Sequence, residues 1–407
     1  MYIKQIIGLV LLSVSLVTIV HAESSRSATN QPTPSERYEK NVLAIVALIE
    51  QGQLETALSK TDTLLEQHPE SRIAYIMKAD ILRAMNGELN GFADGLDHSS
   101  KAYSDFHHEL NNRSQQYSLE ETVAEKKDYA DYYPASILDM GQDSHMLLAE
   151  MSTGRFFVVK NTNGRPQIIY DYYMTIGKAG YGKQVEGDNK TPLGLYHVTR
   201  EIDGAQLPDL YGSGAFPVNY PNKIDRWRKR TGYGIWLHGT PSDTYSRAPL
   251  ASEGCFVLSN EDYDHVAPLI RAVERPRVLL VETVSWLSAS EYDTHKKNYI
   301  DVLKGWAADW ESLDVERYLS HYSIEDFNLG ADNFAQWSQR KRNVSKSKEF
   351  VQLAIDVNGL FIYPGEKDMF VVDFQQRYLS NNYQSKSAKQ QYWQKNRQGQ
   401  WKIIYEG

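Results

Sequence analysis

The chain has 407 residues, a formal net charge of −8, 41% hydrophobic residues and one cysteine. The length predicts about two to four domains, and the apolar fraction excludes wholesale disorder because it suffices for ordinary cores. One cysteine excludes an intrachain disulfide framework and a cysteine-cluster zinc site, and the negative charge argues against bulk nucleic-acid binding.

The N-terminal segment has the pattern of an export signal. Lys4 precedes an apolar stretch from Ile6 to Val20, and Val20-His21-Ala22 precedes Glu23. A short basic region, a short apolar region and a small-residue cleavage site predict a secretory signal peptide over residues 1–22, cleaved after Ala22. The stretch is short for a spanning helix, which needs roughly 20 residues. An uncleaved membrane anchor is the alternative.

Residues 23–34 are rich in Ser, Thr, Asn, Gln and Pro and predict a flexible linker. Residues 35–135 are expected to form a helical domain, with helices over 42–49, 55–65 and 73–82 separated by Gly52 and Pro69. The pattern resembles one tetratricopeptide repeat and part of another; a generic helical hairpin is the alternative. Residues 101–127 continue as a polar helical stretch, which is expected to cover the next domain or to form a homodimer surface.

From Ser136 the hydrophobic period changes from helical to β. Short apolar runs separated by Gly and Asn turns predict a β-rich domain over residues 136–286, with strands over 146–150, 155–160, 167–176, 235–237 and 277–282. A helix capped by Asn260 is predicted over 260–274.

Residues 287–407 are expected to form a third domain. Ser288 and Glu291 have capping-box spacing, and aromatic residues around Trp306, Trp310 and Tyr318 recur helically as predicted core. Alternating strands follow over 350–357, 369–378, 388–395 and 401–405. Helices followed by a curved antiparallel sheet indicate an α+β cone, which resembles the nuclear-transport-factor-2-like (NTF2-like) fold. The fold alone does not show whether such a domain holds a ligand or docks a partner protein.

Two blocks carry the chemistry, Gly187–Tyr196 and His238–Leu258. Cys255 follows Gly254, which permits a tight turn, and His238 stands upstream at the end of an apolar strand. The pair predicts a thiolate–imidazolium nucleophile with His238 as general base and backbone N–H groups around Gly254 and Cys255 as oxyanion donors. No Asp or Asn is obviously spaced to orient the imidazole, so a backbone carbonyl is expected to do so, with Gly239 adjacent.

These blocks resemble the L,D-transpeptidase catalytic (YkuD) domain over residues 136–284. Its signature is His-Gly-(Thr or Ala) followed by Ser-x-Gly-Cys, with Thr-Pro-x-Gly-x-Tyr/Phe upstream, here Thr191–Tyr196. The resemblance implies no cofactor or metal, a Cys255 nucleophile, a His238 base held by the Gly239 carbonyl, and a substrate pocket shaped by Thr240, Ser252 and Gly254.

The implied substrate is the peptide stem of peptidoglycan, and the implied location is the periplasm. Cys255 would attack the carbonyl of the third stem residue, usually diaminopimelate, and release the terminal D-alanine. The acyl group would then pass to water (L,D-carboxypeptidase) or to an amine (L,D-transpeptidase).

The chain departs from the commonest family pattern at Glu253 and Val257, where many members have His and Arg. The missing Arg puts the usual contact to a substrate carboxylate in doubt. Gly-Cys-x-x-Leu resembles a hydrolysing subgroup, which includes cell-shape L,D-carboxypeptidases with a C-terminal NTF2-like domain and an amidase that releases a wall-linked lipoprotein. Hydrolysis is therefore favoured; transpeptidation, lipoprotein release and a non-catalytic envelope scaffold are the alternatives.

A basic run over residues 226–230 precedes the His238 strand. It is either a solvated loop or a clamp in which Arg226 and Arg228 bind stem-peptide carboxylates. The helical and NTF2-like domains are expected to contact envelope protein partners. In all, the chain is predicted to be a multidomain α+β protein with a TPR-like helical domain, a YkuD-type catalytic domain and an NTF2-like cone.

Overall fold

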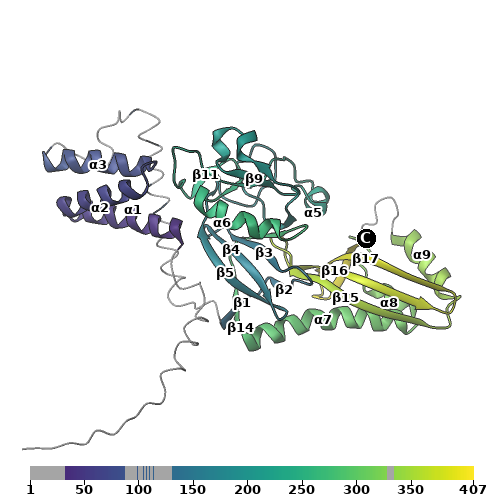
Figure 1. Ribbon diagram of the computed structural model, residues 1–407. Helices are drawn as coiled ribbons and strands as arrows, with labels where there is room; N and C mark the ends of the chain where they lie inside the picture. Colours follow the sequence, from purple (N-terminus) through teal and green to yellow (C-terminus); the bar gives the residue numbers. More distant parts are fainter. Residues whose placement is uncertain are drawn as a thin grey trace, which may run out of the picture.

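The computed structural model describes residues 33–87, 131–327 and 334–407, together with residues 99, 104, 107, 110 and 113. Three parts lie in a row, with helices at one end, a β-rich centre and a long-stranded sheet at the other end (Figure 1). This confirms the expected fold class. The predicted signal peptide, nearly all of the linker and most of the polar stretch over 101–127 lie outside the described residues. None of the described helices has the length and apolarity needed to cross a membrane.

The N-terminal part consists of helices α1 (Pro34–Glu50), α2 (Leu54–Gln67) and α3 (Arg72–Met85). Gly52 has φ +70° in the turn between α1 and α2, and the Ser71 hydroxyl caps α3 by accepting a hydrogen bond from the Ala74 N–H. The three apolar faces enclose one core with Tyr245, which comes from the central part of the chain. The N-terminal helices are thus packed on the central domain.

The central part contains two main sheets. One has the strand order β5-β4-β3-β13-β7 and is formed by β3 (His145–Glu150), β4 (Arg155–Thr162), β5 (Arg165–Tyr173), β7 (Gly194–His197) and β13 (Arg277–Val281). The smaller has the order β12-β10-β9-β8 and is formed by β8 (Ile202–Asp203), β9 (Gly214–Pro217), β10 (Trp236–His238) and β12 (Phe256–Val257). A short pair of β6 (Ile176–Gly177) and β11 (Leu250–Ser252) lies beside them. The alternation of short apolar runs and turns produced this arrangement as expected.

Helices α5 (Lys223–Trp227) and α6 (Asn260–Arg271) complete the central part. The prediction that Asn260 caps α6 is wrong. The cap is Ser259, whose hydroxyl accepts a hydrogen bond from the Asp262 N–H. The Asn260 side chain is therefore left for another use.

The C-terminal part contains α7 (Ala289–Glu311), α8 (Val315–Ser320) and α9 (Phe334–Ser345), followed by β15 (Val351–Ile362), β16 (Met369–Ser380), β17 (Tyr383–Lys395) and β18 (Trp401–Glu406). The predicted capping box is present, because the Glu291 carboxylate accepts from the backbone N–H and the hydroxyl of Ser288. Trp306 and Tyr318 are buried core residues as expected. Trp310 packs at the edge of this core and lines a cavity instead.

Short strands tie the central and C-terminal parts together. β2 (Ile137–Asp139) extends the C-terminal sheet beside β15, and β1 (Tyr132–Pro134) pairs with β14 (Trp286–Ser288). The Tyr292 hydroxyl of α7 donates to the carbonyl oxygens of Ile137 and Leu138. The central and C-terminal parts are therefore joined by paired strands as well as by the chain that connects them.

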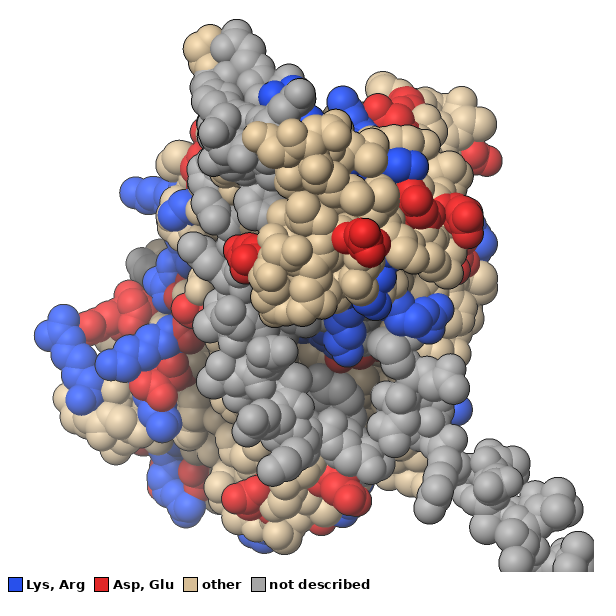
Figure 2. Space-filling model, turned by 90° about the vertical axis from the view of Figure 1, so that its left-hand side faces the viewer, with Lys and Arg blue, Asp and Glu red and all other residues tan. Residues whose placement is uncertain are grey.

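Figure 2 shows the face that presents the N-terminal helices. Acidic and basic side chains of the described residues are interspersed over it. Because the charges are mixed, the described residues on this face form no large positive patch that would attract a polyanion.

Candidate active site

The predicted catalytic residues lie at two adjacent strands of the smaller sheet: His238 ends β10, and Cys255 directly precedes β12. β10 and β12 pair in parallel, with Leu237 opposite Phe256 and His238 opposite Val257. Continuing that register back by one residue places Cys255 beside Trp236. Because side chains alternate across a sheet, Cys255 and His238 fall on the same face. The fold therefore brings the two blocks of the second motif together, as the spacing predicts.

The His238 imidazole is buried and has a fixed orientation. Its Nδ1 lies 2.7 Å from the Gly239 carbonyl oxygen, so Nδ1 carries the proton and Nε2 is the basic nitrogen. The Tyr211 ring packs edge-on against the imidazole, with the ring centroids 5.0 Å apart. Burial lowers the pKa of His238 to about 4. The imidazole is thus neutral at pH 7, which is the form that accepts a proton.

Cys255 is half-buried, and its Sγ lies 3.4 Å from the Gly234 carbonyl oxygen. Burial raises the pKa of its thiol to about 11. The directions of these two shifts oppose a resting thiolate–imidazolium pair. Both groups are removed from water, and removal from water disfavours whichever form is charged. Both directions favour a neutral thiol and a neutral imidazole in the resting pair.

Ser252 and Gly254 build the turn that presents the thiol. The Ser252 hydroxyl donates to the Cys255 carbonyl at 2.6 Å and accepts from the Gly254 N–H at 3.1 Å. Gly254 has φ +124°, and a Cβ there would lie 2.9 Å from the Lys190 carbonyl oxygen. The Gly254 N–H donates to Ser252 within this turn and is not available to a substrate. Of the two backbone groups predicted as oxyanion donors, the Cys255 N–H is therefore the candidate.

The first sequence block, residues 187–196, packs against this turn through the Lys190 carbonyl. Lys183 Nζ lies 2.8 Å from Asp188 Oδ1. Burial raises the pKa of the Asp188 carboxyl, but hydrogen bonds from Lys183 and three backbone N–H groups outweigh it and lower the pKa to about 2. The Thr191 hydroxyl accepts from the Gly177 N–H at 2.9 Å. The block therefore fixes the backbone on which the Gly254–Cys255 turn rests.

Asn260 is a site residue that sequence reasoning missed. Its Oδ1 accepts from the Thr240 N–H at 3.1 Å and the Ser213 N–H at 2.9 Å, and its Nδ2 donates to the Thr240 carbonyl at 2.8 Å. The Thr240 N–H belongs to the same peptide plane as the Gly239 carbonyl that holds His238. Asn260 therefore fixes the orientation of the imidazole through one peptide unit. The usable signal was Ser259, which directly precedes Asn260 and is an equally favourable helix cap.

Thr240 is held inside its own loop. Its side chain is buried, and its hydroxyl lies 3.3 Å from the Tyr245 carbonyl oxygen within the same loop. Its hydroxyl therefore braces this loop, and its substrate-binding role stays a prediction.

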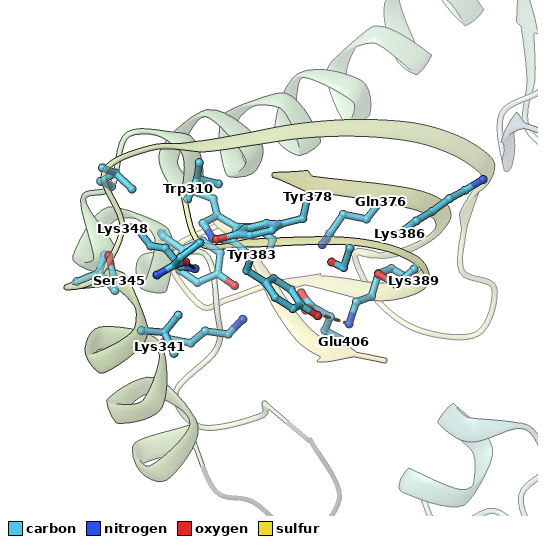
Figure 3. Close-up of a pocket in the computed structure, with 18 of the residues that line it drawn as sticks. Trp310, Lys341, Ser345, Lys348, Gln376, Tyr378, Tyr383, Lys386, Lys389 and Glu406 are labelled. Carbon is cyan, nitrogen blue, oxygen red and sulfur yellow. Dashed lines mark hydrogen bonds and ion pairs between the residues drawn. The ribbon is translucent and has the colours of Figure 1, made fainter. Parts of the chain in front are cut away.

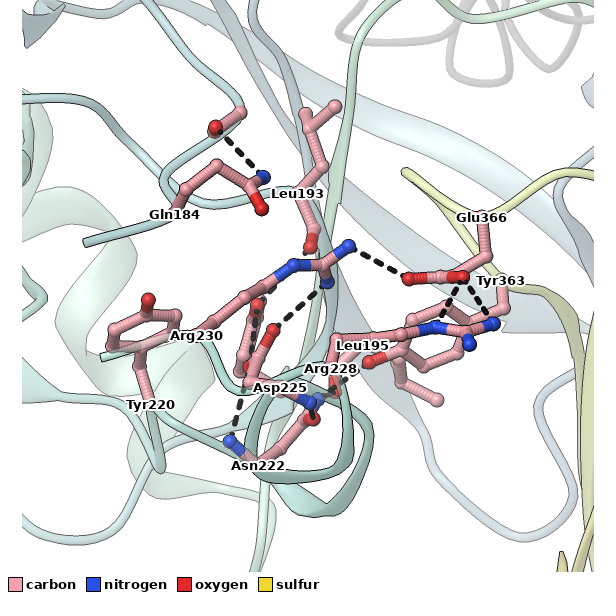
Figure 4. A network of polar contacts seen from close by, with 12 residues as sticks. Gln184, Leu193, Leu195, Tyr220, Asn222, Asp225, Arg228, Arg230, Tyr363 and Glu366 are labelled. Atoms are coloured by element: carbon pink, nitrogen blue, oxygen red, sulfur yellow. Dashed lines mark hydrogen bonds and ion pairs between the residues drawn. The ribbon is translucent and has the colours of Figure 1, made fainter. Parts of the chain in front are cut away.

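Two arginines of the basic run over residues 226–230, Arg228 and Arg230, point toward Glu366 of the C-terminal part (Figure 4). Arg228 Nε donates to Glu366 at 2.9 Å, and Arg230 joins Asp225 at 3.1 Å and Glu366 at 2.7 Å. The predicted carboxylate clamp is thus wrong for Arg228, because a carboxylate of this chain already occupies its guanidinium. Arg226 is exposed and donates to the nearby Pro221 carbonyl; nothing links it to the Cys255 turn, and its substrate role stays a prediction.

A cavity lies inside the C-terminal cone, away from the predicted catalytic residues, with a volume of about 800 Å³ (Figure 3). Four lysines line it, with two acidic residues and four large aromatic side chains: Lys341, Lys348, Lys386, Lys389, Asp314, Glu406, Trp310, Tyr318, Tyr378 and Tyr383. Lys341 Nζ lies 5.1 Å from the Trp310 ring centroid. The buried Gln376 Oε1 has no hydrogen-bond partner among the described residues. The cavity is suited to an anionic ligand with groups that can hydrogen-bond.

Two family models match this chain. Residues 145–281 match the L,D-transpeptidase catalytic domain, and residues 298–407 match the Cds6 C-terminal NTF2-like domain. The chain therefore carries a YkuD catalytic domain followed by an NTF2-like domain, which confirms the resemblance. Helices α1–α3 lie outside both matched segments.

Solved structures share this combination. Bd1075 of Bdellovibrio bacteriovorus is 28% identical, with a TM-score of 0.59 over 68% of this chain and 98% of that chain. The helical cell shape determining protein Pgp2 of Campylobacter jejuni is 25% identical, with a TM-score of 0.55 over 68% of this chain and 95% of that chain. No curated protein matches the chain. The chain is thus similar to a cell-shape determinant and has a domain of a peptidoglycan-related family.

Proposed function

We propose that this chain is a periplasmic cysteine enzyme that removes the terminal D-alanine from peptidoglycan tetrapeptides through an acyl-enzyme on Cys255. The observation that carries the proposal is the His238 imidazole, which is neutral, buried and fixed by the Gly239 carbonyl on the strand beside Cys255. A structural neighbour described as a cell shape determining protein supports the link to the wall.

The neutral pair defines the first chemical step. The Cys255 thiol transfers its proton to His238 Nε2 as the sulfur attacks the carbonyl of the third stem residue, so no thiolate has to persist in the buried site. The imidazolium that forms is stabilised by the Gly239 carbonyl at Nδ1. The Cys255 N–H would donate to the oxyanion.

Collapse of the tetrahedral intermediate breaks the C–N bond to D-alanine. His238 returns the proton to the leaving nitrogen, which departs as an amine, and a thioester remains on Cys255. Water, deprotonated by His238, then attacks the thioester; its hydroxyl completes the tripeptide carboxyl group and the proton returns to the thiol. An amine acceptor in place of water gives a cross-link instead, which is the transpeptidase alternative.

The decisive experiment is incubation of the full chain with purified disaccharide-tetrapeptide, with and without an amine acceptor, followed by mass spectrometry. Loss of D-alanine without incorporation of the amine supports hydrolysis. Incorporation supports transpeptidation and overturns the carboxypeptidase assignment. The matched control is Cys255→Ala, and activity that survives in it contradicts the acyl-enzyme mechanism.

Two further outcomes separate the alternatives. If tetrapeptide is inert but a lipoprotein-linked stem peptide is cleaved, the chain is an amidase. If neither reacts, the chain is a non-catalytic envelope scaffold. Export is part of the proposal, and the mass of the mature protein tests cleavage after Ala22. The homodimer and the envelope partners stay predictions, to be tested by light scattering and by crosslinking in cells.

We propose in addition that the cavity of the cone binds a carboxylate-bearing part of the wall polymer. The lining lysines support it, because charge-assisted hydrogen bonds from ammonium groups to a carboxylate are stronger than neutral ones. The unpartnered Gln376 amide oxygen could accept a hydrogen bond from a hydroxyl or amide N–H of the same polymer. This second site would hold the polymer while the Cys255 site acts on it.

A further inference from the structure

The loop over residues 239–249 follows the His238 strand, and the N-terminal helices hold its middle. The Tyr245 side chain comes from this loop and is buried in the core formed by α1–α3. Its ring centroid lies 4.5 Å from that of Tyr38 in α1 and 4.0 Å from that of His68, which directly follows α2. A loop of the catalytic domain is therefore part of the N-terminal core.

A buried polar cluster holds Ser246, the next residue of the loop. The Ser246 hydroxyl donates to Glu39 Oε1 of α1 at 2.5 Å, and the Ser246 carbonyl accepts from Arg113 at 3.1 Å. Glu39 and Arg113 are paired with each other and almost fully buried. Because buried charges are costly to leave unpaired, this cluster fixes the Ser246 backbone relative to α1.

Tyr245 is connected to Thr240 by two routes. The Tyr245 carbonyl accepts from the Thr240 hydroxyl at 3.3 Å. The Tyr245 hydroxyl donates to Glu261 Oε2 at 3.1 Å. Glu261 is the neighbour of Asn260, whose side chain binds both the N–H and the carbonyl of Thr240. A residue held by α1–α3 therefore contacts the Thr240 side chain and also the start of the helix that holds the Thr240 backbone.

One peptide unit separates Thr240 from the catalytic imidazole. The Thr240 N–H and the Gly239 carbonyl belong to the same peptide, and that carbonyl oxygen lies 2.7 Å from His238 Nδ1. Tyr245, Thr240 and His238 are all buried. Close-packed interiors transmit a displacement instead of absorbing it. A shift of Tyr245 in the N-terminal core should therefore reach the imidazole.

We propose that Tyr245 is a positioning residue through which α1–α3 keep the His238 imidazole aligned with Cys255. The catalytic consequence rests on the proposed function, in which His238 Nε2 takes the thiol proton. A displacement of about 1 Å caused far from the chemistry can reduce a rate about a hundredfold. Because α1–α3 lie outside both matched segments, the catalytic domain of this chain depends on a unit that is an addition to the matched domains.

The position of the imidazole can be tested without turnover. The full chain is labelled with isotopic histidine for NMR, and the Nδ1–H proton of His238 is assigned by its absence from His238→Gln. Its exchange with water should be about tenfold faster in Tyr245→Leu and in Ser246→Ala, because the peptide that accepts this proton is held less firmly. Tyr245→Phe keeps the ring in the N-terminal core and should recover most of the protection. Wild-type exchange rates in the folded variants overturn the proposal.

The matched control is Thr61→Ala. It also removes one buried hydroxyl from the N-terminal core, but the partner of that hydroxyl is the Ala57 carbonyl in the same helix. Its exchange rate should stay at the wild-type value. Thermal melting shows whether each variant is folded, and Ser246→Ala keeps the apolar packing if Tyr245→Leu does not fold. Equal acceleration in Thr61→Ala and Ser246→Ala would mean general loosening of the helices and would overturn the proposal.

The activity arm uses the tetrapeptide. Tyr245→Leu and Ser246→Ala should lower kcat about tenfold with KM nearly unchanged, since no substrate contact is removed. Thr240→Val removes the hydroxyl that joins the two residues, so its combination with Ser246→Ala should lose less than the product of the two single losses. Fully independent losses, or a wild-type kcat in the folded variants, overturn the catalytic role of the helices.

The two readouts separate this inference from the function on which it rests. No turnover by the wild type overturns the proposed function and, with it, the catalytic consequence. The exchange rate of the His238 proton still decides, in that case, whether α1–α3 position the imidazole.

Discussion

The Cys255 site and the cavity of the cone are built in opposite ways. The Cys255 site has few charges and is held by backbone groups: the Gly239 carbonyl, the Ser252–Cys255 turn and the peptide plane held by Asn260. The cavity has walls of long strands and helices that carry lysines and aromatic rings. Short fixed hydrogen bonds suit a reacting centre that must not move, whereas flexible cations over aromatic rings suit binding of a variable ligand.

This difference indicates that chemistry and ligand retention are separate functions in one chain. Substitutions at the Cys255 site should affect bond cleavage and leave binding to the cone unchanged. Substitutions in the cavity should do the reverse. The predictions below test that separation.

The largest effect is expected for Cys255→Ala. Loss of the nucleophile should reduce release of D-alanine by about a thousandfold or more, as read by mass spectrometry of the muropeptides. Binding of the same variant to purified sacculi in a sedimentation assay should stay at the wild-type level. Loss of sacculus binding along with activity would contradict the separation of the two regions.

A large effect is also expected in the pH dependence of Cys255 alkylation. Burial raises the pKa of the thiol to about 11, and the thiolate is the reactive form, so less of it is present at any pH below that value. At pH 7 iodoacetamide should react about a hundredfold more slowly than with an ordinary cysteine, and the rate should keep rising through pH 9. A rate that levels off below pH 8 would restore the thiolate–imidazolium pair.

A smaller loss is expected for Asn260→Ala. It frees the peptide plane that carries the Gly239 carbonyl, so kcat should fall about thirtyfold with KM nearly unchanged. Asn260→Asp keeps the oxygen that accepts from Thr240 and should recover part of kcat. It also adds a charge near His238 and should move the pH profile of kcat to higher pH. A purely structural role predicts a lower melting temperature in both variants and no shift of that profile.

The smallest effect is expected in the cavity. Lys348→Gln with Lys386→Gln should weaken binding of the chain to carboxylate-bearing wall fragments about tenfold, measured by calorimetry at low and high salt. The Cys255 alkylation rate should not change. Lys304→Gln, on the exposed side of α7, is the matched control. Equal binding by the double variant and this control would remove the cavity from the proposed function.

Several features could be predicted because they depend on neighbours in sequence. The strands of the cone follow from alternating side chains, the α7 start from the Ser288–Glu291 spacing, and the Gly254 turn from a residue that alone tolerates that backbone. The contact between His238 and Gly239 is also local, since it joins adjacent residues.

Other features depended on partners far away in the chain. Arg228 is an exposed basic residue in sequence terms, but Glu366 binds it from the other domain. Asn260 is a residue type that favours helix caps, but its side-chain oxygen accepts hydrogen bonds from the backbone N–H groups of Thr240 and Ser213 instead. Neither partner is visible from local spacing.

The sequence by itself determined which residues carry the chemistry, because a glycine turn, a lone cysteine and an upstream histidine need only motif order to be recognised. Only the tertiary structure decided their charge state and their support. The pKa values of Cys255 and His238 depend on how much water the surrounding chain removes. Likewise, the place of the loop that contains Tyr245 depends on α1–α3 packing around that side chain, a contact between segments that are distant in sequence.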